Sequence, residues 1–328
     1  MIQVENVRKT YGAFTALDGL SLTAAEGTVL GLLGPNGSGK TTTVKVLTTL
    51  LAPDSGDAWV AGHSVLDNPD LVRRNLGLSG QYAAVDEKLT AFENLHMVGR
   101  LYGMNRRTAS ARAHELLANF RLTDVAGKRA GTFSGGMRRR LDLAGAIVAR
   151  PKVVVLDEPT TGLDPRGRLD TWEVISGLVS DGTTVLLTTQ YLEEADRLAD
   201  HIAVINHGSV IAEGTATELK DGAGAERIDI TVRNAVDLQA AAAVLALAAD
   251  GLGTPEVDPA ALSVSIAAPG GHQMLVRVLA ELDARSLPVA EASLRRPTLD
   301  DVFLQLTGGT AKTNPQSTPD TSMEGVPA

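Results

Sequence analysis

Gly34-Pro35-Asn36-Gly37-Ser38-Gly39-Lys40-Thr41 is the stretch that decides the fold of this chain, because it fits the phosphate-binding pattern G-x-x-x-x-G-K-[ST]. The apolar run 28–33 before it predicts a buried strand, and residues 41–47 after it can open a helix. Loop glycines in that context let several backbone N–H groups point at phosphate oxygens, and the helix N-terminus adds its positive end. Lys40 would then reach the β- and γ-phosphates of a nucleotide, and the Thr41 hydroxyl would bind Mg²⁺.

A second stretch, Val153-Val154-Val155-Leu156-Asp157-Glu158, completes the pattern of a nucleotide site. Its four apolar residues are typical of a strand buried on both faces of a parallel sheet. Asp157 at the strand end could hold Mg²⁺, and Glu158 could polarise a water for attack on a γ-phosphate. The competing interpretations are a glycine-rich turn that binds nothing and a solvated pair of carboxylates. The two stretches together favour the nucleotide site over both.

Composition restricts the possible functions. The chain has 328 residues, enough for more than one domain, and a net charge of −9 that argues against nucleic acid as the main partner. It has no cysteine, which excludes disulfides, zinc–thiolate sites and cysteine nucleophiles. Neither a signal peptide nor an apolar run near the ~20 residues of a membrane span is visible. A cytosolic location is therefore expected.

The order of predicted elements indicates an α/β architecture with additions. Strands alternating with helices predict a largely parallel sheet with helices on its faces, and residues 2–7, 15–22 and 57–61 predict further strands. A helical insert is expected over about 82–150, where Thr90 and Glu93 form a capping-box pattern. After a linker that begins at residue 221, strand, helix, strand, helix and strand predict a small α+β domain over 221–307, closed by a short helix at 299–304. Residues 308–328 are rich in Pro, Ser, Thr and Gly and are predicted to be disordered.

Five motifs in order resemble those of the ATP-binding subunits of ABC transporters, over roughly residues 1–220. Residues 34–41 match Walker A, Gln81 stands where that family has its Q-loop glutamine, and Phe133-Ser134-Gly135-Gly136-Met137 matches the family signature. Residues 153–158 match Walker B, and Thr161-Gly162-Leu163-Asp164 resembles the D-loop. The resemblance implies a P-loop NTPase fold with an antiparallel β subdomain and a helical insert.

The resemblance also implies a role for each matching residue. Glu158 is implied to be the general base, assisted by Gln81 and Gln190, and the implied Mg²⁺ ligands are Thr41, Gln81 and Asp157. The implied ATP-binding set consists of Tyr11, stacked on adenine, together with Gly34, Pro35, Asn36, Gly37, Ser38, Gly39, Lys40, Thr41, Thr42, Ser134, Gly135, Gly136 and Asp164. Ser134 and Gly136 are implied to contact the γ-phosphate bound to an opposite subunit. The active species should therefore be a head-to-tail homodimer with ATP in its interface.

The sequence departs from the family pattern at two places. Phe133 and Met137 replace the usual Leu and Gln of the signature, while Ser134 and the glycines are retained. Gln190 replaces the usual switch histidine after the Thr-rich strand. A glutamine can hydrogen-bond a γ-phosphate but has no proton that titrates near neutral pH. We therefore predict slow but real hydrolysis.

Three stretches narrow the resemblance to the daunorubicin-resistance type of ATPase subunit: residues 80–86, 135–142 and 188–196. That type implies an integral membrane permease as partner, a peripheral position on the cytoplasmic side of the membrane, and export of hydrophobic drugs or lipids. The alternatives are a soluble ABC-type ATPase acting on ribosomes or DNA, and a regulatory nucleotide switch without turnover. Residues 138–140, three arginines, are either an anion-binding patch or a solvated helix face.

Overall fold

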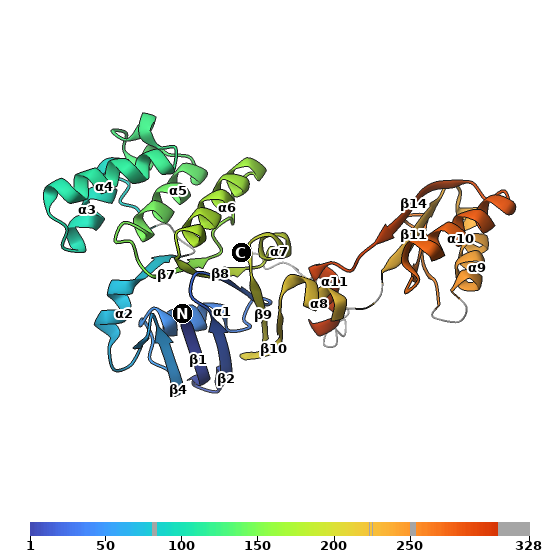
Figure 1. Cartoon of the computed structure of the whole chain (residues 1–328), viewed down its shortest axis with the longest axis horizontal. Helices are drawn as coiled ribbons and strands as arrows, with labels where there is room; N and C mark the ends of the chain where they lie inside the picture. The colour runs from blue at the N-terminus through green and yellow to red at the C-terminus, as the bar shows by residue number, and fades with distance from the viewer. Residues whose placement is uncertain (81–83, 223, 225, 250–253, 308–328) are drawn as a thin grey trace, which may run out of the picture.

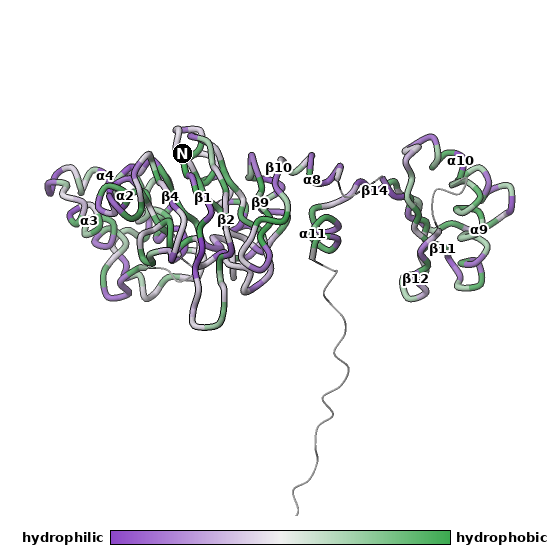
Figure 2. The backbone as a smooth tube through the Cα atoms, turned by 90° about the horizontal axis from the view of Figure 1, so that it is seen from below, coloured by the Kyte–Doolittle hydropathy of each residue, from purple (hydrophilic) through white to green (hydrophobic). Residues whose placement is uncertain are grey.

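A computed structural model describes residues 1–80, 84–222, 224, 226–249 and 254–307. It consists of a large N-terminal part and a smaller C-terminal module, with helices α8 (Ala216–Gly222) and α11 (Leu299–Thr307) between them (Figures 1 and 2). Gln81 and the tail 308–328, which we predicted to be a site residue and a disordered segment, lie outside the described residues.

The large part is built on a six-stranded sheet in the order β10-β9-β3-β8-β7-β6, in which only the β10–β9 pair is antiparallel. The strands are β3 (Val29–Leu33), β6 (Leu76–Ser79), β7 (Val153–Asp157), β8 (Thr184–Thr189), β9 (His201–Asn206) and β10 (Ser209–Gly214). Every residue of β3, β7 and β8 is buried. Val153 and Val155 pack into one core, and Val154 and Leu156 into another. The predicted parallel sheet with two covered faces is confirmed.

One face of this sheet is covered by helix α1 (Lys40–Leu47) and by a second, antiparallel sheet in the order β2-β1-β4-β5. Its strands are β1 (Ile2–Tyr11), β2 (Phe14–Ala24), β4 (Ser55–Val60) and β5 (His63–Ser64). Residue pair Tyr11–Phe14 closes the β1–β2 hairpin, so two aromatic side chains stand at its tip. The predicted antiparallel β subdomain is confirmed.

The other face is covered by helices, which include the predicted helical insert. They are α3 (Ala91–Leu101), α4 (Arg106–Asn119), α5 (Gly135–Ala146) and α6 (Pro165–Ser180), with α2 (Pro69–Asn75) at the sheet edge and α7 (Leu192–Leu198) after β8. The capping box predicted for α3 is present: Glu93 N donates to Thr90 Oγ1 at 3.1 Å, and Thr90 N donates to Glu93 Oε2 at 2.8 Å. This box fixes the start of α3 at the predicted residue.

The C-terminal module is an antiparallel sheet in the order β12-β13-β11-β14, with two helices packed into the same core (Figure 1). Its elements are β11 (Arg227–Val232), α9 (Leu238–Ala248), β12 (Glu256–Asp258), β13 (Ser263–Ala267), α10 (Gly271–Ala284) and β14 (Val289–Arg295). Along β11, Ile228, Ile230 and Val232 are buried in alternation. The sequence analysis missed β12, because three residues between Pro255 and Pro259 carry no readable alternation.

Helix α11 differs from its expected place. The sequence analysis placed it as the closing helix of the C-terminal domain, but Leu299 and Val302 are buried in a cluster with Leu33, Ala195 and Leu219 of the N-terminal part. The chain thus leaves the large part after α8, forms the module, and returns. The apolar face of an amphipathic helix must pack against another part of the protein, but the sequence of the helix does not determine which part that is.

A buried carboxyl on α7 gives a test of this fold. Glu194 is 0% exposed and accepts a hydrogen bond from Trp172 Nε1 at 3.0 Å, while its second oxygen lacks a partner among the described residues. Burial raises the pKa of Glu194 above 4.5, so the folded state holds this proton more tightly than the unfolded state. Stability is therefore lost as pH rises from 4.5 through the folded pKa.

Glu194→Gln removes this charge and keeps an acceptor for Trp172. We expect the variant to have the same free energy of unfolding as the wild type at pH 4, and a free energy of unfolding higher by on the order of 1 kcal/mol at pH 8. Urea unfolding at several pH values measures this difference. The exposed neighbour gives the control, since Glu193→Gln should produce no such trend. A Glu194→Gln advantage that is independent of pH would contradict the assignment.

Candidate functional site

A cavity of about 370 Å³ lies between the tip of the β1–β2 hairpin, the phosphate-binding loop and the end of β7. Its lining contains most of the predicted ATP and Mg²⁺ residues that precede Ser134, together with Asp157 and Glu158. These residues are Tyr11, Phe14, Ala16, Asn36, Gly37, Gly39, Lys40, Thr41, Thr42, Asp157 and Glu158. The structure thus brings together residues up to about 150 positions apart in the chain.

Two glycines of the loop are required by geometry. A Cβ on Gly34 would stand 2.3 Å from the Ile205 carbonyl oxygen, which leaves no room for a side chain. Gly39 has φ = 117°, in the region that favours glycine, and its Cβ would stand 2.8 Å from the Ala16 carbonyl oxygen. The loop therefore wraps closely against β9 and β2.

Lys40 begins α1 and is 6% exposed. Its ammonium donates to the carbonyl oxygens of Gly34 (2.5 Å) and Pro35 (3.0 Å), so it lies folded along the loop. Burial lowers the pKa of Lys40, while the nearby carboxylates of Glu158 and Asp157 act in the opposite direction. Ser38 Oγ is also buried, with no partner among the described residues. A buried cation and an unpaired hydroxyl next to glycine N–H groups are a donor set suited to phosphate.

The two carboxylates at the end of β7 are held by β8. Asp157 Oδ1 accepts a hydrogen bond from the Thr188 hydroxyl, and Glu158 N donates to the Thr188 carbonyl oxygen at 2.9 Å. Glu158 has φ = 50°, which is uncommon for a residue other than glycine and costs free energy. This backbone turn ends the strand and carries the Glu158 side chain to the cavity, where Thr161 Oγ1 donates to it at 3.1 Å.

Gln190 is exposed and follows β8 directly. It lines a second cavity, of about 200 Å³, on the other side of the phosphate-binding loop. That cavity is bounded by Leu33, Gly34, Pro35, Asn36, Thr189, Gln190, Leu192 and Phe303. Gln190 thus borders the loop at Gly34, Pro35 and Asn36 but does not line the cavity of Lys40 and Glu158, and its contact with a γ-phosphate stays a prediction.

The signature residues lie outside both cavities. Ser134 is the N-cap of α5, with Oγ accepting from Met137 N at 3.3 Å, and it is exposed. A Cβ on Gly135 would meet nothing, and one on Gly136 would meet only Leu163 at 3.7 Å. Glycines at the start of a helix lower its stability, yet nothing in this part of the chain requires their small size. Asp164 likewise caps α6, accepting from Gly167 N at 2.9 Å.

Sequence reasoning missed three features of the site. Phe14 lies at the hairpin tip beside Tyr11, which an aromatic three residues away could have indicated. Thr188 orients Asp157, which only strand pairing reveals. Arg139 was considered as part of an anion-binding patch or a solvated helix face, but it is 7% exposed. Arg139 faces inward because of its position on the turn of α5. Three consecutive arginines do not show which of them takes that position.

Arg139 joins α5 to the nucleotide cavity by three hydrogen bonds to backbone carbonyls. It donates to the oxygens of Pro159 (2.8 Å), Asp157 (3.0 Å) and Gly80 (2.5 Å). Its charge lies 3.6 Å from buried Asp142, which accepts from Ser79 Oγ at 2.6 Å and from Ala84 N at 2.7 Å. Burial raises the pKa of Asp142, while Arg139 and these hydrogen bonds lower it. The start of the signature helix is thereby fixed to the strand ends that carry Asp157 and Gly80.

Removing this guanidinium should be costly. Arg139→Met leaves Asp142 buried without its cation and three carbonyls without a donor, so we expect a loss of about 3 kcal/mol in unfolding free energy. Urea unfolding measures the loss. Arg138→Met is the matched control, because Arg138 forms an exposed pair with Glu87 at 2.8 Å and should cost less than about 1 kcal/mol. Equal losses of unfolding free energy in the two variants would show that Arg139 stabilises the fold no more than an exposed arginine does.

The chain is similar to known proteins over most of its length. The ABC transporter family model matches residues 17–161. The daunorubicin resistance ATP-binding protein DrrA3 of Streptomyces coeruleorubidus is 52% identical over 94% of this chain and 96% of its own length. The linearmycin resistance ATP-binding protein LnrL of Bacillus subtilis is 34% identical, over 95% of this chain and 100% of its own length.

Solved structures match the N-terminal part. A dimeric ATP-binding cassette in a post-hydrolysis state with ADP and phosphate has a TM-score of 0.61 and 27% identity, covering 66% of this chain and 98% of that one. A nucleotide-free cassette has a TM-score of 0.62 and 27% identity, covering 67% and 94%. In the described ranges, each helix is too short or too polar to cross a bilayer. The chain is an ABC-type ATPase, and it belongs to the family of ABC transporter ATP-binding subunits, which dimerise and pair with membrane components.

Proposed function

We propose that this chain powers the export of hydrophobic drugs or lipids by hydrolysing ATP while bound, on the cytoplasmic side of the membrane, to a separate integral membrane permease. The observation that carries the proposal is the cavity in which the phosphate-binding loop, Tyr11, Asp157 and Glu158 converge. The direction and cargo rest on the near full-length similarity to resistance ATP-binding proteins.

ATP fits the cavity with each part of the nucleotide against suitable chemistry. Tyr11 is 46% exposed and Phe14 59% exposed at the hairpin tip, which leaves an aromatic face open to an adenine ring. The phosphate oxygens would accept hydrogen bonds from the loop N–H groups, the Ser38 hydroxyl and the Lys40 ammonium. Lys40 would exchange its bonds to the Gly34 and Pro35 carbonyls for bonds to phosphate oxygens.

The residues present also fit Mg²⁺. Thr41 and Asp157 line the same cavity, and hydroxyl and carboxylate oxygens are ligands that Mg²⁺ accepts. When bound, Mg²⁺ would withdraw charge from the β- and γ-phosphates. The hydrogen bond from Thr188 keeps one Asp157 oxygen oriented, so the other can turn to the cavity.

Glu158 is placed to act as the general base. A water oxygen would attack the γ-phosphorus as the bond to the β-phosphate oxygen breaks, and the proton of that water would pass to the Glu158 carboxylate. The Gln190 amide would donate a hydrogen bond to the γ-phosphate. Ser134, Gly135, Gly136 and Asp164, which face away from both cavities, would act on ATP held by a second copy of the chain.

An apolar groove of about 310 Å³ is the proposed permease contact. It lies between the sheet edge at β6 and helices α3 and α5, and Ala84 and Val85 in its wall follow the segment that contains Gln81. Leu50 and Tyr102 on its rim are 69% and 45% exposed. An apolar groove bordered by Arg73 and Asp142 suits a short amphipathic cytoplasmic helix.

The proposed base gives the first test of turnover. Glu158→Gln keeps the size and the backbone turn but cannot accept the proton, so phosphate release should fall by about 10²–10⁴-fold. ATP affinity should stay within a few-fold, and the variant should dimerise in ATP. Glu193→Gln serves as the control with the same chemical change on the surface. Unchanged phosphate release in Glu158→Gln would assign the base elsewhere.

The switch position gives the second test. Gln190→His should raise the hydrolysis rate several-fold and make it depend on pH near the ordinary histidine pKa of about 6.5. Steady-state phosphate release between pH 5.5 and 8.5 measures both effects, with Gln190→Ala as the variant expected to be slower. If neither rate nor nucleotide affinity changes with histidine, Gln190 does not reach the γ-phosphate.

Export itself is tested by capturing the partner. Tagged Glu158→Gln protein, recovered from its native membranes with MgATP, should retain a polytopic membrane protein in stoichiometric amount. Adding Leu50→Glu in the groove should release it, whereas adding Val276→Glu should not, because Val276 is 64% exposed on the module and far from the groove in sequence. Recovery only with ribosomes, or without any membrane protein, would contradict the exporter role.

A further inference from the structure

Helix α11 reaches the nucleotide site from the far end of the chain. It follows the last strand of the C-terminal module, yet Leu299 and Val302 are 4% and 5% exposed against the N-terminal part. Leu33, in the same cluster, is the residue directly before Gly34. Leu299 and Val302 thus share a cluster with the last residue of the strand that leads into the phosphate-binding loop, and α11 itself lies beside α8 (Figure 1).

Phe303 is the residue of α11 that comes closest to the chemistry. It packs against the same cluster and lines the cavity that also contains Gly34, Asn36 and Gln190. The other residues around that cavity come from the end of β3, the loop, the end of β8 and the segment that follows β8. One aromatic ring from the C-terminal end of the chain thus lies beside the loop and the residue proposed to contact the γ-phosphate.

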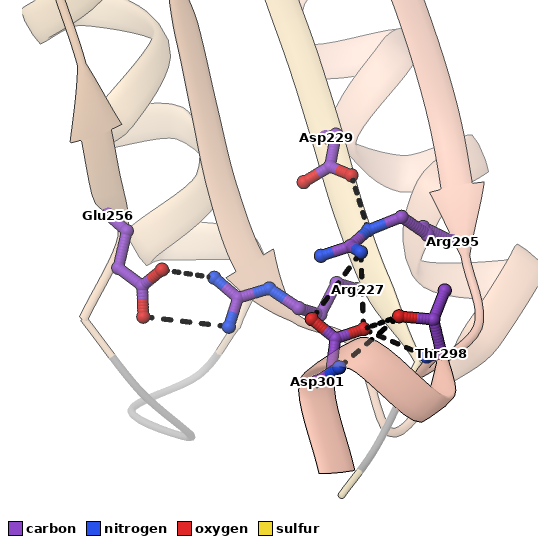
Figure 3. A network of polar contacts seen from close by, with 6 residues as sticks. All are labelled: Arg227, Asp229, Glu256, Arg295, Thr298 and Asp301. Carbon is purple, nitrogen blue, oxygen red and sulfur yellow. Dashed lines mark hydrogen bonds and ion pairs between the residues drawn. The ribbon is translucent and has the colours of Figure 1, made fainter. Parts of the chain in front are cut away.

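The first turn of α11 is fixed to the module by a polar network, shown in Figure 3. Thr298 and Asp301 cap the helix reciprocally, since Thr298 N donates to Asp301 Oδ2 at 2.8 Å and Asp301 N donates to Thr298 Oγ1 at 3.3 Å. Arg295 then bridges Asp301 at 3.2 Å and Asp229 of β11 at 3.4 Å. The polar bonds to the module's sheet and the apolar contacts of α11 thereby act on the same first turns of one short helix.

We propose that Phe303 is a positioning residue for ATP hydrolysis. Its ring bounds the cavity that Gln190 and residues 34–36 also line, and this wall restricts Gln190 to orientations that reach the γ-phosphate. The C-terminal module, through Arg295 and α11, sets the position of this ring and thus the rate of turnover. The proposal rests on the proposed role of Gln190.

The test uses the purified full-length chain. Phe303→Ala should lower kcat about five- to tenfold, as expected when a positioning contact is lost. Its affinity for ADP, which lacks a γ-phosphate, should stay within twofold. Phe303→Leu keeps an apolar side chain of similar reach and should retain at least half of the rate. Leu304→Ala is the matched control, because Leu304 is 66% exposed on the same helix and should leave kcat unchanged.

Coupling to Gln190 separates positioning from a general structural effect. In a Gln190→Ala background, Phe303→Ala should produce no further loss of kcat, since the two residues act through one contact. Fully multiplicative losses in the double variant, or equal weakening of ADP and ATP binding, would overturn the proposal. Where Phe303→Ala folds poorly, Phe303→Val, which shortens the side chain less, combined with Gln190→Ala gives the same comparison.

A final variant tests the module's part. Arg295→Ala cuts the bridge while leaving the Thr298–Asp301 cap in place, and it should lower kcat in the same direction as Phe303→Ala. An unchanged kcat would overturn the role assigned to the module. Glu158→Gln, measured in parallel, keeps the outcomes distinct: its loss of turnover supports the ATPase site even if Phe303→Ala has no effect.

Discussion

The parallel pairing of β3, β8 and β7 is the constraint on which the site depends. Leu33 pairs with Thr189, and Asp157 with Thr188, so the three strands end within one residue of each other. The residues that follow these strand ends therefore lie at one edge of the sheet. They are the phosphate-binding loop, Glu158 and Gln190. A register shift of one residue would turn Asp157 away from Thr188 and reverse the faces that bury Val153 and Val154. The chemistry is thus held in place by apolar strands that take no part in it.

Arg139 extends this constraint to the residues that we propose to serve another copy of the chain. The helix that begins at Ser134 carries the signature outward, while Arg139, five residues later, binds the carbonyl of Asp157 beside this chain's own cavity. Ser134 and Asp157 cannot move independently while that bond holds. In a dimer with two composite sites, a change at one phosphate site would be carried through a rigid helix to the other. This is a mechanical reason for two subunits to act together.

Much of the fold could be predicted from the sequence, because its strongest signals are local. The glycine loop, the Thr90–Glu93 capping box and the continuous apolar runs of β3, β7 and β8 each specify their own element, and the site residues around Lys40 and Asp157 follow from motif order. Phe14, Thr188 and Arg139 were missed for the opposite reason. Their roles arise from hairpin closure, strand pairing and helix phase, which place residues together across long sequence distances.

The position of α11 could not be predicted from its own sequence. Leu299, Val302 and Phe303 predict an amphipathic helix correctly, but two apolar surfaces were available to cover it: the module's core and the cluster around Leu33. The module's sheet already has α9 and α10 in its core, so its apolar face is filled. The cluster around Leu33, Ile202 and Val204 is covered partly by α7 and α8, and Leu299 and Val302 of α11 complete it. Packing therefore brings α11 back beside the strand that leads into the phosphate-binding loop, and makes this helix part of the nucleotide-binding domain.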